Sequence, residues 1–335
     1  MGDFEAVRRQ RFLSNRYYDW LLPQFTEQVE YWAQHDAPSG ASEPERKALA
    51  ARYRASYAHR RFLLEFTSGK SLVALRNELP LLVDTLELYS TLNRAAMWDD
   101  SVPPLMFGEI GEYEKAMQLI SLCHLLHCTE LLPRLANTLD RFYCAQDTLY
   151  EDLLSYGMDG RYDVDKWFHD RPYRLLINSF YRDSEEESIR DVAAYLDAWY
   201  PAMKEAPWHD CHLKANEQEG GAYVGYWAIE AAAAAYLLEL DDTSFRNHLL
   251  YPKDLTDFAR AFEVRQQPQS AEAGARPLTV RTGQICPETG VWNAAGHNVP
   301  GVMVRQGEVM PDVYIPDARG TLKPTPATWI FERKA

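Results

Sequence analysis

Long apolar runs are missing from this 335-residue sequence. No segment approaches the roughly 18 consecutive apolar residues that a membrane span requires, and the polar start MGDFEAVRRQRF has no apolar segment of the signal-peptide type. Cysteine is scarce, and the five residues are an odd number spread widely along the chain. They are Cys123, Cys128, Cys144, Cys211 and Cys286. These absences predict a protein of the reducing cytoplasm whose thiols are free.

An excess of basic residues is also missing. The chain has 35 lysines and arginines against 49 aspartates and glutamates, a formal net charge of -14. This balance argues against nucleic acid or an anionic membrane as partner and favours a basic partner. From Arg276 onward there are seven basic and five acidic residues, a net charge of +2, so the preceding residues carry -16.

Sequence signatures of catalysis are absent too. The run Thr67–Ser71, TSGKS, ends like a phosphate-binding loop, but Leu64 stands where that loop needs a glycine, and a helix is predicted where a strand should precede it. The chain has no GxSxG elbow, dinucleotide-binding glycine pattern or kinase motif set. Carboxylates are so abundant that sequence alone does not single out a catalytic pair. We therefore predict no catalytic residue.

Two clusters of histidine and cysteine raise the question of a metal. They are Cys123-His124 with His127-Cys128, and His209-Asp210-Cys211-His212. On a helix, residues four apart share a face, so His124 with Cys128, or Cys123 with His127, could supply two ligands. Neither cluster has zinc-finger spacing or an HExxH motif. We interpret the first as core packing and the second as a polar turn, and predict no metal or cofactor. A metal-dependent helical enzyme stays as an alternative.

Apolar residues recur at helical spacing over most of the chain. Ser42 with Glu45 has the spacing of a capping box, and Ser184 followed by three glutamates is a strong helix start. Pro23 and Pro80 should bend their helices. The predicted helices cover residues 4–34, 42–67, 70–95, 111–127, 130–146, 148–156, 173–181, 184–204, 222–240 and 254–264, with a short helix after Asp242 through Leu250.

The character of the sequence changes after residue 264. Residues 265–277, RQQPQSAEAGARP, are polar and aperiodic, which predicts a linker. Short β-type runs follow at residues 278–281, 290–292, 299–305, 312–315 and 328–332. The prediction is a mainly all-α protein: a multi-helix bundle with a small β-rich C-terminal module. The predicted divisions are an N-terminal helical domain (1–157), a C-terminal helical domain (158–264), the linker (265–277) and the module (278–335).

The stretch from Gly220 to Leu255 is predicted to contain the central helix of the bundle. It contains the alanine run Ala231–Ala235, which lets a neighbouring helix approach closely. Tyr223, Trp227, Glu230 and Tyr236 recur at roughly helical spacing, so residues 222–240 are predicted to form one buried core helix. An unpaired buried charge would be costly, so Glu230 should have a buried arginine or tyrosine partner.

Three patches of this sequence resemble a known family. The run Tyr223–Ala232, the pair Asp241-Asp242 and the run Tyr251–Leu255 resemble the C-terminal helical domain of PoNi-type immunity proteins. Arg60–Gly69, RRFLLEFTSG, is similar to the helical N-terminal region of related immunity families, and Thr282–Trp292 with Gly307–Pro311 resembles a small module at the end of some of them. PoNi-type proteins protect bacteria from polymorphic nuclease toxins, often delivered by type VI secretion.

The resemblance implies a helical body without catalytic activity that binds a cognate toxin and blocks it. It carries over no defined contact residues, because such proteins diversify their binding surfaces with their toxins. Its matching residues are expected to hold the scaffold together: Tyr223, Trp227, Glu230, Tyr251, Pro252 and Asp254. The β-rich module departs from the minimal helical pattern and leaves the toxin class open. A scaffold or adaptor that recruits another protein through this module is a further alternative.

Charge favours the immunity interpretation independently. The active face of a nuclease is usually basic because it must attract phosphate, and a body at -16 would be steered towards it. The expected partner is therefore a toxin with a basic active face, rather than nucleic acid or a membrane; the sequence carries no signal for oligomeric state. Acids in loops and at helix starts are the expected contacts. They are Glu185, Glu186, Glu187, Glu217, Glu219, Asp241 and Asp242.

Overall fold

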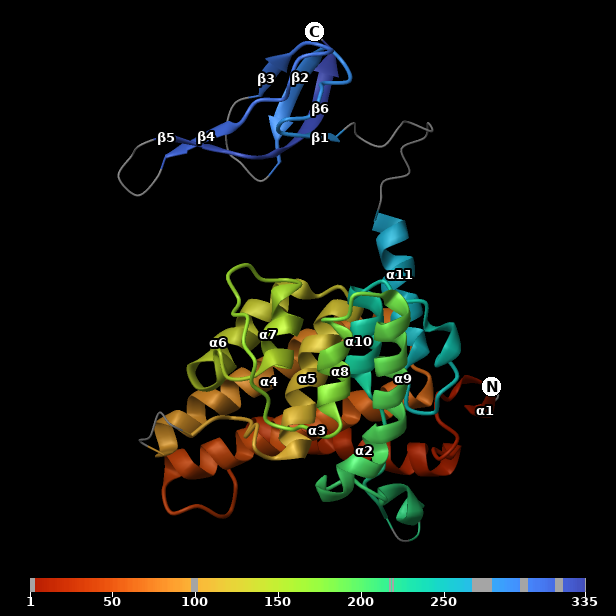
Figure 1. Cartoon of the computed structure of the whole chain (residues 1–335). Helices are drawn as coiled ribbons and strands as arrows, with labels where there is room; N and C mark the ends of the chain where they lie inside the picture. Colours follow the sequence, from red (N-terminus) through yellow and green to blue (C-terminus); the bar gives the residue numbers. More distant parts are fainter. Residues whose placement is uncertain are drawn as a thin grey trace. The chain divides into compact units, whose positions relative to one another are not determined.

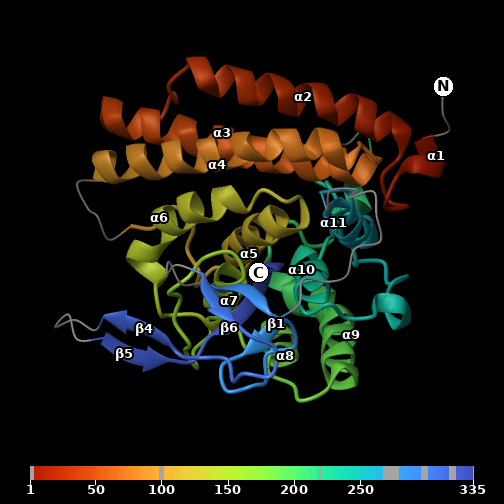
Figure 2. The same cartoon turned by 90° about the horizontal axis from the view of Figure 1, so that it is seen from above.

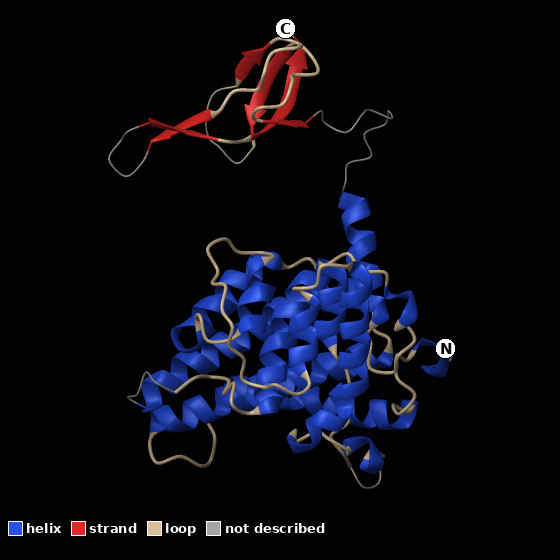
Figure 3. Cartoon of the chain, viewed as in Figure 1, coloured by secondary structure: helices blue, strands red, loops and turns tan. Residues whose placement is uncertain are grey.

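The computed structural model describes residues 4–97, 102–216, 218, 220–266, 279–295, 301–316 and 322–334. The chain forms two compact units, residues 1–267 and residues 268–335. The first unit is built from helices and the second from strands (Figure 1, Figure 3). This confirms the predicted mainly α fold with a small β-rich C-terminal module. The subdivision of the helical unit at residue 157 stays a prediction.

Three long helices form one side of the helical unit. They are α2 (Asn15–Gln34), α3 (Glu43–Ser68) and α4 (Leu72–Met97), which follow α1 (Phe4–Val7). Figure 2 shows the three lying side by side, and α3 packs against both of its neighbours. Their apolar faces meet the remaining helices in one continuous core.

The rest of the unit consists of shorter helices on the inner side of that layer (Figure 2). The α-helices are α5 (Ile110–Leu125), α6 (Leu132–Tyr143), α7 (Thr148–Ser155), α8 (Tyr173–Ser179), α9 (Glu185–Ala202), α10 (Ile229–Leu237) and α11 (Lys253–Gln266). Single 3-10 turns are η1 (Thr129–Leu131), η2 (Met203–Glu205), η3 (Cys211–Lys214) and η4 (Asp242–Ser244). No helix among the described residues combines the length and apolarity needed to cross a membrane.

Local signals set several helix ends where the sequence predicted them. The Ser42 side chain accepts a hydrogen bond from the Glu45 amide, and the Glu45 carboxylate accepts one from the Ser42 amide, which completes the capping box of α3. The Ser184 hydroxyl accepts from the Glu187 amide at the start of α9. At the end of α3, Gly69 has a φ of 96°, a left-handed conformation that glycine adopts without steric cost.

The predicted helix over residues 222–240 is wrong for its first part. Residues 221–228 have no helical structure, and α10 begins only at Ile229. Gly221 and Gly225 have φ values of 136° and 118°, which are incompatible with a right-handed helix. Ala231–Ala235 are fully buried, and α10 packs closely on α5, α9 and α11 as the alanine run suggested.

Two further helix predictions need correction. The helix expected over residues 4–34 is divided into α1 and α2, and the intervening residues carry Arg9 and Gln10 into the core region. The short helix expected after Asp242 is only the turn η4, and Asp241 rather than Asp242 accepts the capping hydrogen bond, from the Thr243 amide.

The C-terminal unit is a small antiparallel β structure. Four strands pair in the order β1 (Thr279–Arg281), β6 (Thr328–Lys334), β2 (Gly290–Ala294) and β3 (Val302–Val304). The strands β4 (Val313–Pro316) and β5 (Leu322–Thr325) form a separate hairpin. Trp292 and Trp329 are almost completely buried in its core. The proline-containing β5 was not predicted. Of the predicted linker, residues 265–266 belong to α11 and residues 267–277 lie outside the described residues.

Candidate functional site

The non-helical segment 221–228 passes through the core of the helical unit, and Gln10 holds its middle. The Gln10 Nε2 donates to the Tyr226 carbonyl at 2.5 Å, and its Oε1 accepts from the Tyr226 amide at 2.8 Å and from the Tyr223 hydroxyl at 2.6 Å. Backbone groups buried outside a helix or sheet must find such partners. A side chain more than 200 residues away in sequence supplies them here.

Two other side chains complete this support. The Thr67 hydroxyl lies 2.5 Å from the Val224 carbonyl and accepts from the Trp227 Nε1 at 2.8 Å, while the Gln118 Nε2 donates to the Trp227 carbonyl at 3.0 Å. A Cβ atom on Gly225 would lie 2.2 Å from the Thr67 Oγ1, closer than real contacts allow. The segment therefore needs glycine at 225 both for its φ and for its close approach to α3.

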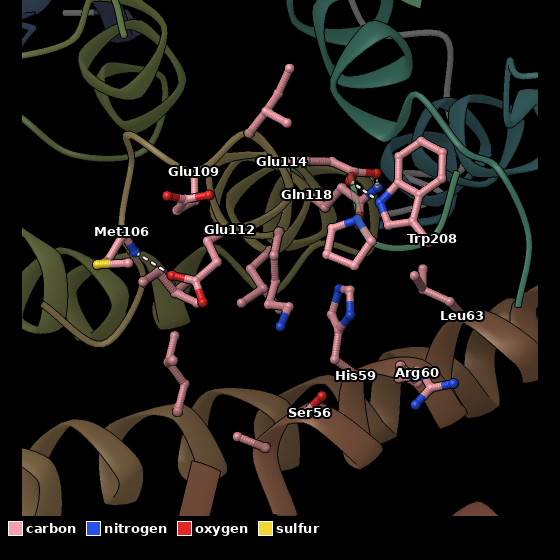
Figure 4. Close-up of a pocket in the computed structure, with 18 of the residues that line it drawn as sticks. Ser56, His59, Arg60, Leu63, Met106, Glu109, Glu112, Glu114, Gln118 and Trp208 are labelled. Carbon is pink, nitrogen blue, oxygen red and sulfur yellow. Dashed lines mark hydrogen bonds between the residues drawn. The ribbon is translucent and has the colours of Figure 1, made fainter. Parts of the chain in front are cut away.

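Glu230 is a completely buried acid in the first turn of α10. Its Oε1 accepts hydrogen bonds from the Tyr195 hydroxyl at 2.5 Å and the Trp199 Nε1 at 3.2 Å, which confirms the predicted tyrosine partner. Burial raises the pKa of Glu230. Burial also raises the pKa of Glu114 well above its usual value, with a further contribution from the charge of Glu230. The Glu114 carboxylate accepts from the Trp208 Nε1 and from Gln118 (Figure 4). Both acids act as internal hydrogen-bond acceptors.

The other predicted scaffold residues also lie in or beside the core. Tyr223, Trp227, Tyr251 and Pro252 are buried. Asp254, at the start of α11, accepts from the Arg9 guanidinium at 2.7 Å and so ties α11 to the N-terminal region. These contacts agree with a structural role for the whole set.

Asp242, one of the expected toxin contacts, faces inward. Only 4% of its surface is exposed. Its carboxylate lies 3.0 Å from Arg246 and 3.3 Å from Arg260, and it accepts from the Tyr251 hydroxyl at 3.0 Å. With its oxygens occupied by these internal partners, we leave Asp242 out of the candidate contact surface.

Glu185 and Asp241, both expected contacts, meet at the surface of the helical unit. The Glu185 Oε1 accepts from the Asp241 amide at 3.0 Å, although the two residues are 56 positions apart. They border a groove of about 650 Å³ that Glu239 also lines. All three acids are exposed. We call this feature the acidic groove and define it by Tyr156, Glu185, Tyr236, Glu239, Asp241 and Arg260.

Local hydrogen bonds favour the charged form of Asp241 in the acidic groove. Hydrogen bonds from the Thr243 hydroxyl and amide lower the pKa of Asp241. Arg260 is the one arginine or lysine among the groove's described lining residues, and it already bonds Asp242 and the Leu240 carbonyl. Tyr156 adds an aromatic side chain with 46% of its surface exposed. The groove thus presents three carboxylates and an accessible ring.

The remaining predicted contacts lie elsewhere. Glu186 is exposed beside Glu185 on the first turn of α9, whereas Glu187 is half-buried and lies 3.9 Å from Arg190. Glu217 and Glu219 lie outside the described residues. Sequence reasoning missed Glu239 and Tyr156. Glu239 was hidden inside the predicted helix, although its position directly before Leu240-Asp241 marks the same helix end.

The histidine and cysteine clusters are occupied by internal contacts. The His124 Nε2 lies 2.7 Å from the Leu153 carbonyl, and the His127 Nε2 lies 2.8 Å from the Ala259 carbonyl. In the second cluster, the His212 Nδ1 lies 2.8 Å from the Tyr226 hydroxyl. All five cysteines are free thiols. Across the described ranges, no three His, Cys, Asp or Glu side chains are grouped as metal ligands would be.

A larger cleft, of about 830 Å³, opens between α3 and α5. Ser56 and His59 of α3 face the Glu114, Gln118 and Trp208 group across it (Figure 4). We call this feature the α3–α5 cleft. No sequence signal points to it, because its walls come from several separate parts of the chain.

Comparison with known proteins finds one family that part of the chain resembles. The family model "PoNe immunity proteins (PoNi), C-terminal" matches residues 145–255. Segment 221–228, Glu230 and all three carboxylates of the acidic groove fall within that range. Residues 145–255, about a third of the chain, are thus similar to the C-terminal domain of PoNi immunity proteins.

The fold of the helical unit is also found in a solved structure. The crystal structure of protein PA2201 from Pseudomonas aeruginosa matches with a TM-score of 0.62 at 22% sequence identity, over 77% of this chain and 92% of that one. At this identity the match shows a shared fold. The search of curated proteins found no match to this chain.

Proposed function

We propose that this chain is an immunity protein of the PoNi type, and that it neutralises a nuclease toxin by docking the acidic groove onto the basic face of the toxin and covering its active site. The observation that carries this proposal is the meeting of Glu185 and Asp241 at one exposed groove with Glu239. On this proposal the protein acts by binding rather than by catalysis.

Electrostatics support this choice of surface. A nuclease active face is positively charged because it must hold phosphate, and complementary charge increases the rate of association. The chain's net charge of -14 supplies long-range attraction, and the three groove carboxylates supply a local target. Tyr156 lines the groove and offers the kind of aromatic contact that often dominates binding energy at interfaces.

The test is a double charge reversal with a matched control. Glu185→Lys with Asp241→Lys changes the groove, while Glu27→Lys with Glu30→Lys changes two exposed acids of α2 by the same net charge. Helices α2 and α9 lie on opposite sides of the helical unit (Figure 2). Association with the toxin encoded beside this gene is measured by stopped-flow at low and physiological ionic strength, together with nuclease activity.

We expect the groove variant to associate at least about tenfold more slowly at low salt and to lose inhibition, because local complementarity is reversed. The α2 variant should associate only roughly two- to threefold more slowly, because it changes the net charge of the protein but leaves the groove unchanged. Equal losses in the two variants would move the interface away from the groove. Failure of the unmodified protein to bind that toxin, or to protect cells that make it, would overturn the proposed function.

A further inference from the structure

The α3–α5 cleft contains polar groups that have no partner within the described part of the protein. His59 is only 8% exposed, yet its Nε2 makes no hydrogen bond with the described residues. Figure 4 shows His59 extending from α3 into the cleft, towards Gln118 and Trp208. Burial and the neighbouring Lys115 lower the pKa of His59 to about 3, so its ring is neutral at pH 7. A buried polar atom without a partner costs free energy unless something outside the chain satisfies it.

Lys115 of α5 lies on the same cleft and is half-buried. No hydrogen bond or ion pair to its ammonium is found among the residues that the structure describes, and burial lowers its pKa. Its acidic neighbours are otherwise engaged. Glu112 lies 3.7 Å from Arg52 and accepts from the Met106 amide at 2.6 Å, and the carboxylate of Glu114 accepts from Trp208 and Gln118.

Aliphatic side chains line one part of the cleft: Leu63, Leu82, Leu86, Ile110 and Leu119. Charged side chains line other parts, including Glu109, Glu205, Arg52, Arg60 and Arg171. Small-molecule sites typically have volumes of roughly 300–1,000 Å³ and combine apolar walls with a few convergent polar groups. At about 830 Å³, the cleft has that size and that combination.

We propose that the α3–α5 cleft binds a small anionic ligand with an apolar body, such as a carboxylic acid or a phosphate monoester. The anionic head accepts hydrogen bonds from Lys115 and His59, and the apolar body lies along the leucine side chains. Ser56, at the edge of the cleft on α3, supplies one more hydroxyl donor. This site is separate from the acidic groove and does not depend on the proposed toxin interface.

The full chain alone is sufficient for the test. Octanoate and octyl phosphate are titrated against the protein by isothermal calorimetry, with octanol as the neutral ligand of matched chain length. The fluorescence of Trp208, which lines the cleft, gives a second readout. We expect both anions to bind at least about tenfold more tightly than octanol, because a charged hydrogen bond in a buried site is lost with the neutral head.

A variant pair then assigns the binding to this cleft. Lys115→Met keeps an unbranched side chain one atom shorter and removes the charge, and it should weaken octanoate binding at least about tenfold while leaving octanol binding unchanged. Lys253→Met, at an exposed position of α11, should leave octanoate binding unchanged. Thermal melting of both variants checks that they remain folded.

Two results would overturn the proposal. One is octanoate binding no tighter than octanol in the unmodified protein, and the other is octanoate affinity that Lys115→Met does not alter. If Lys115→Met weakens only toxin binding while octanoate fails to bind, the cleft belongs to the toxin interface and the small-ligand proposal is wrong. Because the titrations contain no toxin, their failure says nothing against the proposed function.

Discussion

Segment 221–228 with Glu230 and the acidic groove lie in the same family-matched region but differ in almost every physical respect. The segment is buried, and Gln10, Thr67 and Gln118 bond its backbone and tryptophan. The groove carboxylates are exposed, and what they contact within the chain is mainly backbone or hydroxyl. The hydrogen-bond partners of segment 221–228 restrict which residues and backbone conformation fit there. The exposed carboxylates of the acidic groove can be replaced without disturbing the core.

The acids of the two regions show the same contrast. Burial raises the pKa of Glu230, whereas hydrogen bonds in an exposed loop lower the pKa of Asp241. Glu230 is thus adapted to accept internal hydrogen bonds, and Asp241 to remain charged in water. On the proposed function the two kinds of residue have separate roles, since the buried acid maintains the fold and the exposed acid contacts the toxin.

The largest effect expected is that of Trp227→Ala. This side chain is 3% exposed, packs on Phe66 and donates to Thr67. Its removal should lower the free energy of unfolding by about 3–5 kcal/mol, measured by urea denaturation. Tyr156→Ala is the groove control and should cost under about 1 kcal/mol while weakening toxin binding. A similar loss of stability in both variants would remove the distinction between the two regions.

Gly225→Ala tests how closely the segment approaches α3. The substitution places a methyl group against Thr67 at a φ of 118°, so we expect a loss of roughly 2–4 kcal/mol from backbone strain and overpacking. Gly160 also has a positive φ, 76°, but a methyl group there would have no described atom within 4 Å. Gly160→Ala should therefore cost only about 1–2 kcal/mol. Equal melting temperatures for the two variants would contradict the close approach.

Glu230→Gln sharpens the contrast between the acids through pH. Because the folded-state pKa of Glu230 is raised above its unfolded value of 4.5, the folded state holds the extra proton, and its contribution is lost as pH rises from 4.5 through the folded pKa. The slope is at most about 1.4 kcal/mol per pH unit for one proton. In Glu230→Gln, the free energy of unfolding measured by denaturation should decline less as pH rises from 4.5. Asp241→Asn should change the slope only at acid pH, because the lowered pKa of Asp241 gives stability that is present above pH 3.8 and is lost as pH falls below that value.

The smallest stability effect should come from Glu185→Gln combined with Asp241→Asn. Both side chains are exposed, and the amides keep most of the local hydrogen-bonding capacity. Thermal melting should show little change in melting temperature, while association with the toxin slows at low salt. A large loss of stability would place these residues with the scaffold instead.

Much of the helical unit follows from local sequence. The capping box at Ser42 and Glu45, the cap at Ser184 and the apolar periodicity of α3, α4 and α9 specify those helices where they stand. Residues 221–228 were misassigned because their spacing looks helical. Hydrogen bonds with residues 10, 67 and 118 hold the segment in its non-helical form. The spacing of residues within the segment contains no information about these distant partners.

The candidate site was predictable only in part. Glu185 and Asp241 were chosen from sequence as exposed acids at helix ends, but their contact across 56 residues is a result of packing. Glu239 was assigned to a helix that ends two residues earlier. Asp242 was chosen with Asp241, although burial and two arginines give it an internal role. Asp241 and Asp242 are adjacent, yet the first is exposed and the second is buried. The sequence alone does not show which of the two is buried.

By itself, the sequence determined the fold class, the net charge and the buried alanine helix, because helix caps, periodicity and charge are local or additive properties. Only the tertiary structure decided that residues 221–228 cross the core in non-helical form, which acids share a groove, and that His59 and Lys115 face one cleft without partners among the described residues. Each of those outcomes depends on residues far apart in the chain, whose meeting is fixed by the packing of the whole helical unit.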